Sequence, residues 1–436
     1  MNPQELYQQK RISLAEAVGM IQSRQTVGLA MAASEPSGMM HELGSQAGQL
    51  EDVHIWSSLP LGDYSFVTDP AMEGHFFIES WFYGEINRRA HPQGRVSYIP
   101  CNLHQAVTRK LYANGNRLNV FIGTATPPDA EGNLSLSLSL VIEKQLLEAA
   151  DLVILEINEN RPWTAGDTLV PISKVDHVVE NHVPLSELPP AIPVQEEETI
   201  GGYIADLIED GSTLQLGIGG IPNAITPNLM RRKNLGIHTE MFTDGMLDLY
   251  QAGVITNRRK TLWNGKMVGT FALGTRRLYD FLHRNPVVEF QQGRVSNDPY
   301  LIGKNNKMVS VNTALQVDLM GQVCSQSVGT RHFSGTGGQL DTHRGAQLSP
   351  GGRGIIALRS TAMDNQVSTI VPVLSEGAQV TIPSQDVDTV VTEFGIADLK
   401  GLCLRDRALA LIRIAHPDFR ERLREEVVRL GIVPRL

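Results

Sequence analysis

Ile200–Pro222, IGGYIADLIEDGSTLQLGIGGIP, is the stretch of sequence that decides the fold. Its first half places apolar residues at helical spacing, at Ile200, Ile204, Leu207 and Ile208. Its second half contains a short strand, Thr213–Leu216, that runs directly into a glycine-rich loop, Leu216–Pro222. Alternation of helix and strand is typical of α/β proteins, and it predicts mostly parallel strands that are covered by helices.

The same alternation extends outward in both directions. Short apolar runs that we interpret as strands occur at Thr26–Met31, Leu118–Gly123 and Leu152–Ile157. Helical patterns lie between them at Leu103–Ala113 and Val141–Ala150. A last helix begins near Pro417 and Asp418 and ends at Gly431, which suits a C-terminal cap. We therefore expect an α/β protein with two similar open α/β domains and mostly parallel sheets.

The chain is too long for one compact core, because cores stop growing near roughly 250–300 residues. Its 436 residues are interrupted by Val183–Glu198, VPLSELPPAIPVQEEE, whose prolines exclude a helix interior or a central strand. We therefore expect domains at residues 1–185 and 196–436. Each half has a strand followed by a small-residue loop ending in Pro36 or Pro222, and a later strand ending in Glu156 or Glu393, which hints at a duplicated unit.

Composition excludes several classes of protein. A formal net charge of -9 argues against binding to nucleic acid or to an anionic membrane. Cys101, Cys324 and Cys403 are far apart and show no CxxC spacing, so we expect neither a disulfide framework nor a structural zinc site. The segment Met1–Arg11 has no apolar core typical of a signal peptide, and no apolar run approaches the roughly 20 residues that span a bilayer. The expected location is the cytoplasm.

The segment Asn133–Leu140, NLSLSLSL, predicts a strand by strict alternation. Its leucines would share one face, and Ser135, Ser137 and Ser139 would share the other. The serine face is either exposed to solvent or lines a cleft, and the sequence leaves both possibilities open.

The glycine loop Leu216–Pro222 is the first candidate for a functional site. Its three glycines would let backbone N–H groups approach a phosphate or an oxyanion, although a tight turn without a ligand has the same composition. The loop is not a dinucleotide fingerprint, because residue 222 is proline. Thr226 and Pro227 suit the cap and the first position of a helix, so we expect Ile221–Ile225 to extend the loop.

Two further segments carry polar groups in unusual settings. Gly236–Gly245, GIHTEMFTDG, predicts a strand with two mixed faces, in which Glu240 is followed by Met241 and Phe242. A carboxylate in a cleft at a strand end can act as a nucleophile or a base, whereas an exposed or ion-paired glutamate would have no such role. The segment Ser334–Asp341, SGTGGQLD, is a second glycine loop. Two glycine loops and a carboxylate in one half favour a pocket for a charged ligand.

Six motifs in order resemble the signatures of one family. They are LGIGGIPNAI, GIHTEMFTDG, NDPYLIGKNNKMVSVNTALQVDLMGQV, SGTGGQLDTHRGAQLSPGG, VVTEFGIADLKG and IAHPDF. They resemble those of the acetyl-CoA hydrolase/transferase family, a branch of the class I CoA-transferases that includes 4-hydroxybutyrate, butyryl-CoA:acetate and succinyl-CoA:acetate transferases. The resemblance runs from about Ser13 to Phe419 and is looser in the first half, where YIPCNLHQ and VENHVPLSELP are the recognisable pieces.

The resemblance implies the following site residues. Glu240 would be catalytic, at an active site on the domain interface. The oxyanion and CoA-binding residues would be Gln215, Gly217, Ile218, Gly219, Gly220, Ile221, Pro222, Gly337, Gly338 and Gln339. The acid pocket would contain Ser34, Glu35, Asn102, His104 and Gln105. Two departures bear on that pocket: relatives often have phenylalanine where this chain has Thr342, and glycine between the serines of the LSLSLSL strand.

The implied activity is transfer of CoA from a short acyl-CoA to a short carboxylic acid, such as 4-hydroxybutyrate, butyrate or acetate, through a glutamyl-CoA thioester on Glu240. Coenzyme A enters as a substrate, no metal or redox cofactor is expected, and the chain would form a homodimer or a higher homo-oligomer. The alternatives are a short-chain acyl-CoA hydrolase that uses the same site, a non-catalytic CoA-binding protein, or a subunit similar to the transferase component of citrate lyase.

Overall fold

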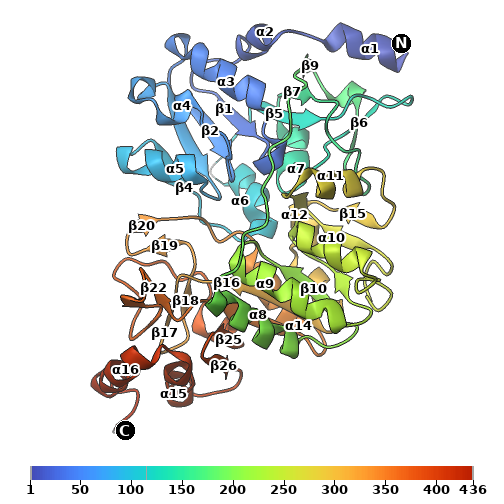
Figure 1. Cartoon of the computed structure of the whole chain (residues 1–436). Coiled ribbons are helices and arrows are strands. Elements are labelled where there is room, and N and C mark those ends of the chain that lie inside the picture. The colour runs from blue at the N-terminus through green and yellow to red at the C-terminus, as the bar shows by residue number, and fades with distance from the viewer. Residues whose placement is uncertain (1, 114, 435–436) are drawn as a thin grey trace. The chain divides into compact units, whose positions relative to one another are not determined.

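The computed structural model describes residues 2–113 and 115–434 and divides into two compact units (Figure 1). Unit 1 contains Met1–Leu188 and Val268–Ser296, and unit 2 contains Pro189–Met267 and Asn297–Leu436. The expected boundaries, 1–185 and 196–436, place the first crossing close to the one observed, but they assign Val268–Ser296 to the second half. The chain therefore crosses between the units three times rather than once.

Unit 1 is built on a seven-stranded sheet in which every neighbouring pair is parallel. The order is β4 (Val96–Tyr98), β3 (Phe76–Ser80), β2 (Val53–Ser57), β1 (Thr26–Leu29), β5 (Val120–Ala125), β7 (Leu152–Ile157) and β9 (His177–Glu180). Its helices are α1 (Pro3–Lys10), α2 (Leu14–Val18), α3 (Ser37–Ser45), α4 (Ser65–Thr68), α5 (Glu85–Ala90), α6 (Ala106–Tyr112), α7 (Glu143–Ala149), α11 (Arg276–Leu282) and α12 (Gly293–Ser296). The strand residues Val27, Ile55, Ile78 and Ile122 pack with Leu43 of α3 in one buried core.

Unit 2 has a six-stranded sheet that is parallel except at one edge. The order is β11 (Gly236–Ile237), β10 (Thr213–Leu216), β16 (Met308–Thr313), β21 (Arg353–Ala357), β25 (Thr389–Thr392) and the antiparallel β26 (Gly395–Asp398). Its helices are α8 (Gln195–Leu207), α9 (Gly220–Asn228), α10 (Asp244–Gln251), α13 (Pro299–Ile302), α14 (Gln339–Leu348), α15 (Leu404–Ile414) and α16 (Pro417–Arg429). The prediction of mostly parallel α/β sheets is confirmed in both units.

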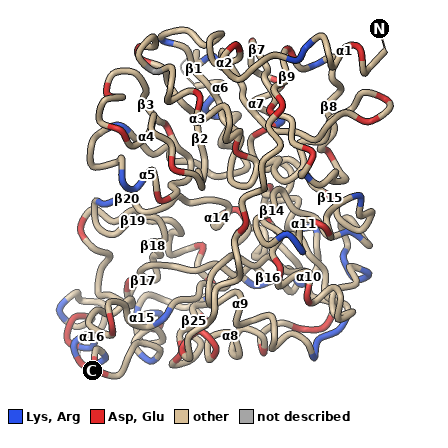
Figure 2. The backbone as a smooth tube through the Cα atoms, turned by 45° about the horizontal axis from the view of Figure 1, so that its top comes forward, with Lys and Arg blue, Asp and Glu red and all other residues tan. Residues whose placement is uncertain are grey.

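The smaller strands lie outside these two sheets. They are β6 (Asn133–Ser135), β8 (Leu169–Pro171), β12 (Met241–Phe242), β13 (Met267–Gly269), β14 (Phe271–Ala272), β15 (Val288–Phe290), β17 (Gln316–Asp318), β18 (Val323–Cys324), β19 (Ser327–Val328), β20 (Arg331–His332), β22 (Thr361–Ala362), β23 (Val367–Ser368) and β24 (Ile370–Val371). Acidic and basic residues alternate along α16 near the C-terminus (Figure 2), where Arg424 pairs with Glu421 and Arg429 pairs with Glu426. None of the helices in the described ranges is long and apolar enough to cross a membrane.

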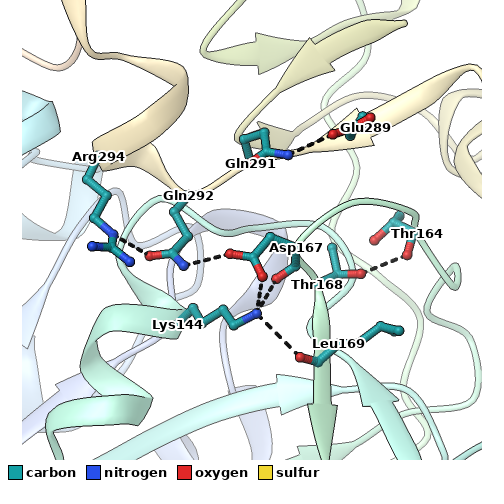
Figure 3. A network of polar contacts seen from close by, with 9 residues as sticks. All are labelled: Lys144, Thr164, Asp167, Thr168, Leu169, Glu289, Gln291, Gln292 and Arg294. Atoms are coloured by element: carbon teal, nitrogen blue, oxygen red, sulfur yellow. Dashed lines mark hydrogen bonds and ion pairs between the residues drawn. The ribbon is translucent and has the colours of Figure 1, made fainter. Parts of the chain in front are cut away.

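The segment Val268–Ser296 belongs to unit 1 because polar and backbone bonds hold it there. Figure 3 shows Asp167 at the centre of these bonds. Gln292 Nε2 donates to Asp167 Oδ2 at 2.6 Å, and Lys144 of α7 forms an ion pair with the same carboxylate. Arg294 Nε donates in turn to Gln292 Oε1 at 2.8 Å. Since Gln292 is buried, these bonds anchor the returning segment to the first unit.

The serine-rich segment is not the regular strand that we expected. Only Asn133–Ser135 forms β6, because Ser137 adopts a φ of 68° and ends the extended conformation. Ser135, Ser137 and Ser139 are all buried, and the Ser137 hydroxyl donates to the Pro162 carbonyl at 2.7 Å. A solvated serine face is therefore wrong: hydrogen bonds inside unit 1 satisfy these hydroxyls.

The start of α9 also differs from the prediction. The helix begins at Gly220 rather than at Thr226, directly after Gly219, whose φ is 109°. Pro227 is the eighth of its nine residues, so the missing N–H removes only one intrahelical bond, near the end of the helix. Such a short helix tolerates proline in its last turn. The glycine loop is consequently shorter than expected, and it leads directly into the N-terminus of α9.

Candidate active site

Glu240 and the first glycine loop lie at the same edge of the unit 2 sheet. Strands β10 and β11 run parallel with Leu214 opposite Ile237, and His238 N–H donates to the Leu214 carbonyl at 3.1 Å. Three residues beyond this pair, the two chains reach Gly217 and Glu240. Neighbouring strands are about 4.8 Å apart, and ligands of open α/β sheets bind at the carboxyl ends of the strands. The sheet therefore brings these two segments to the edge where ligands are expected.

Glu240 is held by two hydrogen-bond donors. The expected continuous strand is interrupted here, since β11 ends at Ile237 and β12 begins at Met241. Asn297 Nδ2 donates to Glu240 Oε2 at 3.2 Å, and the backbone N–H of Gly338 donates to the same carboxylate. Within the described ranges Glu240 makes no ion pair and is only partly exposed, so the alternative of an exposed or ion-paired glutamate is wrong.

The environment of Glu240 changes its protonation. The pKa of Glu240 is raised to about 7, mainly by burial; the Asn297 donor opposes this increase, the nearby charge of Asp341 adds to it, and the Gly338 donor opposes it. A carboxyl group with such a pKa is partly ionised at neutral pH. It is less hydrated than a surface carboxylate and therefore more reactive, which is typical of functional sites.

Gly338 has to be glycine for this arrangement to exist. A β-carbon on Gly338 would lie 2.0 Å from Glu240 Oε2 and 2.0 Å from Asn297 Nδ2. Gly338 is also the N-terminal cap of α14, so the positive end of that helix dipole lies at the Glu240 carboxylate. Gly337 has a φ of 52°, which glycine adopts without strain. The second glycine loop thus supplies a backbone donor to Glu240, and the next residue, Gln339, donates to the Thr313 carbonyl at 3.3 Å.

The first glycine loop has an open part and an occupied part. A β-carbon on Gly219 would meet no atom within 4 Å, and one on Gly217 would have its nearest neighbours at 3.9 Å. A β-carbon on Gly220 would lie 1.9 Å from Glu197 Oε2, so the Glu197 carboxylate lies against the start of α9. An anion at Gly220 would face this carboxylate. Any role as an oxyanion cradle therefore falls to Gly217–Gly219.

The other residues of these loops are placed as follows. Ile218 is exposed, whereas Ile221 and Pro222 are buried in the first turn of α9. Gln215 is buried in β10, and its Oε1 accepts from Ser310 Oγ at 2.7 Å and from Asn312 Nδ2 at 3.2 Å. These polar contacts fix the strand that leads into the loop.

The residues expected to form an acid pocket lie in two places within unit 1. Ser34 and Glu35 follow β1; Ser34 Oγ accepts from Arg161 at 3.3 Å, and Glu35 accepts from Tyr64 Oη at 2.9 Å. Asn102, His104 and Gln105 surround a short 3₁₀ turn, Leu103–Gln105, which packs against α12. That these residues contact an acid stays a prediction. The structure shows hydrogen bonds for Ser34 and Glu35 that hold the loop after β1.

Asn297 is the site residue that the sequence interpretation missed. It precedes Asp298, which caps α13 by accepting from Tyr300 N–H at 2.8 Å, and Pro299, which is the first residue of that helix. This Asp-Pro pair predicts the start of a helix and therefore a fixed backbone at Asn297. It gives no indication that Asn297 would reach Glu240, which is 57 residues away in the sequence.

Comparisons with known proteins agree with these features. The family models for the acetyl-CoA hydrolase/transferase N-terminal and C-terminal domains match residues 1–187 and 274–427. The 4-hydroxybutyrate coenzyme A transferase of Clostridium kluyveri is 44% identical over 98% of this chain and 99% of its own length. The succinyl-CoA:cyclohexane-1-carboxylate CoA transferase of Geobacter metallireducens is 42% identical over 98% of this chain and 96% of its own. The crystal structure of RipA from Yersinia pestis has a TM-score of 0.93 at 35% identity and covers 99% of this chain and 100% of that one.

Proposed function

Because the chain belongs to the acetyl-CoA hydrolase/transferase family, we propose that it transfers coenzyme A from a short acyl-CoA to a short carboxylic acid, with Glu240 as the residue that carries CoA. The observation that carries this proposal is the pair of donors on Glu240, one from the Asn297 side chain and one from the Gly338 backbone. They hold a partly buried carboxylate beside an open glycine loop, and no cation of residues 2–113 or 115–434 pairs with it.

The reaction proceeds by covalent catalysis. The ionised Glu240 attacks the thioester carbonyl of the acyl-CoA, and the C–S bond breaks to give a mixed anhydride and CoA thiolate. The thiolate then attacks the Glu240 carbonyl, which releases the first acid as its carboxylate and leaves a glutamyl-CoA thioester. A second carboxylate reverses these two steps, so a new acyl-CoA forms and Glu240 is restored. Each bond that breaks is matched by one that forms, and no metal or redox change is required.

The donors on Glu240 have a specific task in this scheme. When the thiolate adds to the Glu240 carbonyl, negative charge develops on the carboxyl group to which Asn297 and Gly338 donate. Fixed donors at a developing oxyanion are worth on the order of 3 kcal/mol each. The open backbone at Gly217–Gly219 is suited to the equivalent charge on the substrate carbonyl. Water has to be kept from the anhydride, since its attack would convert the transferase into a hydrolase.

The decisive experiment is to trap the intermediate. The protein is incubated with an acyl-CoA alone and reduced with borohydride, and its peptides are then mapped by mass spectrometry. We expect modification of Glu240. Modification at another residue, or full activity in a Glu240→Ala variant, would contradict the proposal. CoA release with and without added acetate separates the two activities: equal thiol release without acid, and no new acyl-CoA, would identify a hydrolase.

A panel of acids tests the substrate. We expect a short acid of about two to five carbons, with a second polar group tolerated, because each methylene that misfits a packed pocket costs roughly 1–3 kcal/mol. Measurement of kcat/KM from acetate to octanoate, and for 4-hydroxybutyrate and succinate, would reveal the preference. A maximum at octanoate would contradict the short-acid proposal.

Two expectations about the whole molecule accompany this proposal: a homodimer or higher homo-oligomer, and a cytoplasmic location. Sedimentation of the purified chain tests the first, and cell fractionation tests the second. A monomer across the working concentration range, or recovery in another fraction, would contradict them.

A further inference from the structure

A group of four polar side chains in unit 2 connects both glycine loops. We call it the Gln215 cluster; its members are Gln215 of β10, Ser310 and Asn312 of β16, and Thr342 of α14. Ser310 Oγ lies 2.7 Å from Gln215 Oε1 and 2.9 Å from Thr342 Oγ1. Asn312 Nδ2 lies 3.2 Å from Gln215 Oε1 and 3.3 Å from Thr342 Oγ1. The cluster therefore links the strand before the first loop to the helix after the second.

These contacts determine the orientation of the Gln215 amide. Its Oε1 accepts from both Ser310 and Asn312. A flipped amide would place Nε2 against these two donors and would lose both bonds. The Thr342 hydroxyl donates to the Gln339 carbonyl at 3.3 Å, and its Oγ1 lies 2.9 Å from Ser310 Oγ and 3.3 Å from Asn312 Nδ2. Thr342 thus contacts both of the side chains that hold Gln215 Oε1.

The Gln215 amide nitrogen is then left as a free donor. Gln215 is 4% exposed, and within residues 2–113 and 115–434 its Nε2 has no hydrogen-bond acceptor. Polar groups of mostly buried side chains generally have a hydrogen-bond partner in native structures, so this N–H is available to a ligand oxygen or to water. A site that offers such a donor gains the bond when an acceptor oxygen enters.

The position of the cluster indicates which oxygen this is. Thr342 is on the first turn of α14, and its backbone N–H donates at 2.8 Å to the carbonyl of Gly338, the residue that donates to Glu240. One turn of helix is about 5.4 Å long. Gln215 itself is two residues before Gly217, where the open part of the first loop begins. The free donor therefore lies among the elements that surround the reacting carboxylate.

We infer that Gln215 is a substrate-binding residue whose amide donates to an oxygen of the acid or acyl group beside Glu240, and that Thr342 is the positioning residue that keeps this amide in place. The inference rests on the proposed function and specifies how that site recognises its acid. It also gives a role to Thr342, one of the two positions at which this chain departs from the pattern that it resembles.

Four variants test the inference. Thr342→Val removes the hydroxyl at nearly constant volume, and Thr342→Ser is the matched control that keeps it. We expect KM for the acid to increase about tenfold in Thr342→Val and in Gln215→Ala, with a smaller change in kcat, because a neutral hydrogen bond to bound substrate is lost. Thr342→Ser should stay close to the wild type. In the Gln215→Ala background, Thr342→Val should raise KM no further.

The outcomes separate this inference from simple structural damage. A KM increase in Thr342→Val that persists without Gln215 would show that Thr342 does not act through Gln215 and would overturn the positioning role. An unchanged KM in Gln215→Ala, in a protein with wild-type thermal stability, would overturn the binding role. If Gln215→Ala unfolds, Gln215→Met provides a more conservative truncation of the same donor.

The choice of acid identifies the acceptor oxygen. An equal KM increase for butyrate and 4-hydroxybutyrate assigns the donor to the reacting carboxyl group, and an increase confined to 4-hydroxybutyrate assigns it to the terminal hydroxyl. No increase with either acid overturns the inference. Trapping of glutamyl-CoA in the wild type is measured in parallel, so that a failure of the proposed function is distinguished from a failure of this step.

Discussion

The two units share a sheet plan but use their buried carboxyl groups differently. In unit 1 the order β2-β1-β5-β7-β9 corresponds to β11-β10-β16-β21-β25 in unit 2. In each series the strand that comes first in the sequence, β1 or β10, occupies the second position. Glu35 follows β1 and Glu240 follows β11, and burial raises the pKa of each carboxyl group to about 7. Glu35 accepts from three donors, Leu61 N–H, Gly62 N–H and Tyr64 Oη, whereas Glu240 accepts from two.

This difference shows that a raised pKa alone does not identify a reactive group. Three fixed donors hold Glu35 in a loop, and two of them come from the backbone of the next loop. Glu240 lies instead between a helix N-terminus and an open glycine loop. The same desolvation therefore accompanies a carboxyl group held by three donors in one unit and a candidate nucleophile in the other, and the surrounding geometry distinguishes them.

The strongest test of the comparison replaces each carboxyl group in turn. Glu240→Ala should lower kcat at least about a thousandfold, because it removes the nucleophile. Glu35→Gln should leave kcat within a few-fold and lower the free energy of unfolding by about 1–3 kcal/mol. The reason is that both carboxylate oxygens of Glu35 accept hydrogen bonds, whereas an amide has only one acceptor oxygen. Steady-state kinetics and urea unfolding of both variants check this. A selective KM increase for the acid in Glu35→Gln would instead support the acid-pocket role predicted from the sequence.

The second test concerns the donors on Glu240. Asn297→Ala should lower kcat about a hundredfold, which is typical for the loss of one oxyanion donor. Asn223→Ala is the matched control, since Asn223 Nδ2 also donates, to the Ala191 carbonyl at 2.8 Å, but lies on α9. Equal effects of the two substitutions on kcat would mean that Asn297 has no special role.

The third test uses pH. The rate constant kcat/KM for acyl-CoA should increase about tenfold per pH unit below the Glu240 pKa of about 7 and level off above it, because only the ionised form attacks. In Asn297→Ala, where a donor that lowers the pKa is missing, the rise should move to higher pH. A flat profile between pH 5 and pH 8 would contradict the assignment of Glu240 as the titrating nucleophile.

The same raised pKa has a consequence for stability, with a definite sign. The folded protein holds the Glu240 proton more tightly than the unfolded chain, so this group stabilises the fold fully below its ordinary pKa of 4.5 and loses that contribution as the pH rises to about 7. The stability of Glu240→Gln relative to the wild type should therefore increase between these two pH values and then remain constant. Urea unfolding at several pH values measures it, and a decrease over this range would be inconsistent with a buried neutral carboxyl group.

The smallest expected effects come from the first glycine loop. The protein without ligand has room for Gly217→Ala, because the nearest neighbours of the new β-carbon would be 3.9 Å away. We therefore expect normal stability, but about a tenfold lower kcat because the methyl group would obstruct the approach of the oxyanion to the backbone. Gly220→Ala would collide with Glu197, so its main effect should be on stability. Thermal denaturation beside kinetics separates the two. Normal kcat in Gly217→Ala would show that the loop does not approach the transition state.

Much of this molecule follows from local patterns. Strands Leu152–Ile157 and Thr213–Leu216 were predicted with the bounds that the structure has, because short apolar runs followed by turn signals identify buried parallel strands. Contacts between residues that are far apart in the sequence could not be predicted from such local patterns. The contact between Asn297 and Glu240, and the return of Val268–Ser296 to unit 1, depend on side chains and segments that are far apart in the sequence.

The similarity between the two halves of the sequence illustrates the limit of such patterns. The two strands that end in glutamate, β7 with Glu156 and β25 before Glu393, resemble one another in sequence. In the sheet order, however, β7 corresponds to β21 rather than to β25. The duplicated plan is present in the topology, but the matching glutamates are not at equivalent positions. Short sequence similarity could not distinguish these alternatives because both strands are buried and rich in β-branched residues.

The return of Val268–Ser296 to unit 1 has a consequence for biosynthesis. A ribosome that has completed residue 188 has made most of unit 1, but the remaining part of that unit ends only at residue 296. At roughly 5–20 residues per second, translation of the intervening chain takes on the order of ten seconds. During this interval the nascent chain has the carboxylate of Asp167 without Gln292, and the backbone groups of Leu138 and Leu140 without their partners Ala272 and Thr270. Unit 1 is thus begun first, but its contacts with Val268–Ser296 can form only after much of unit 2 has been synthesised.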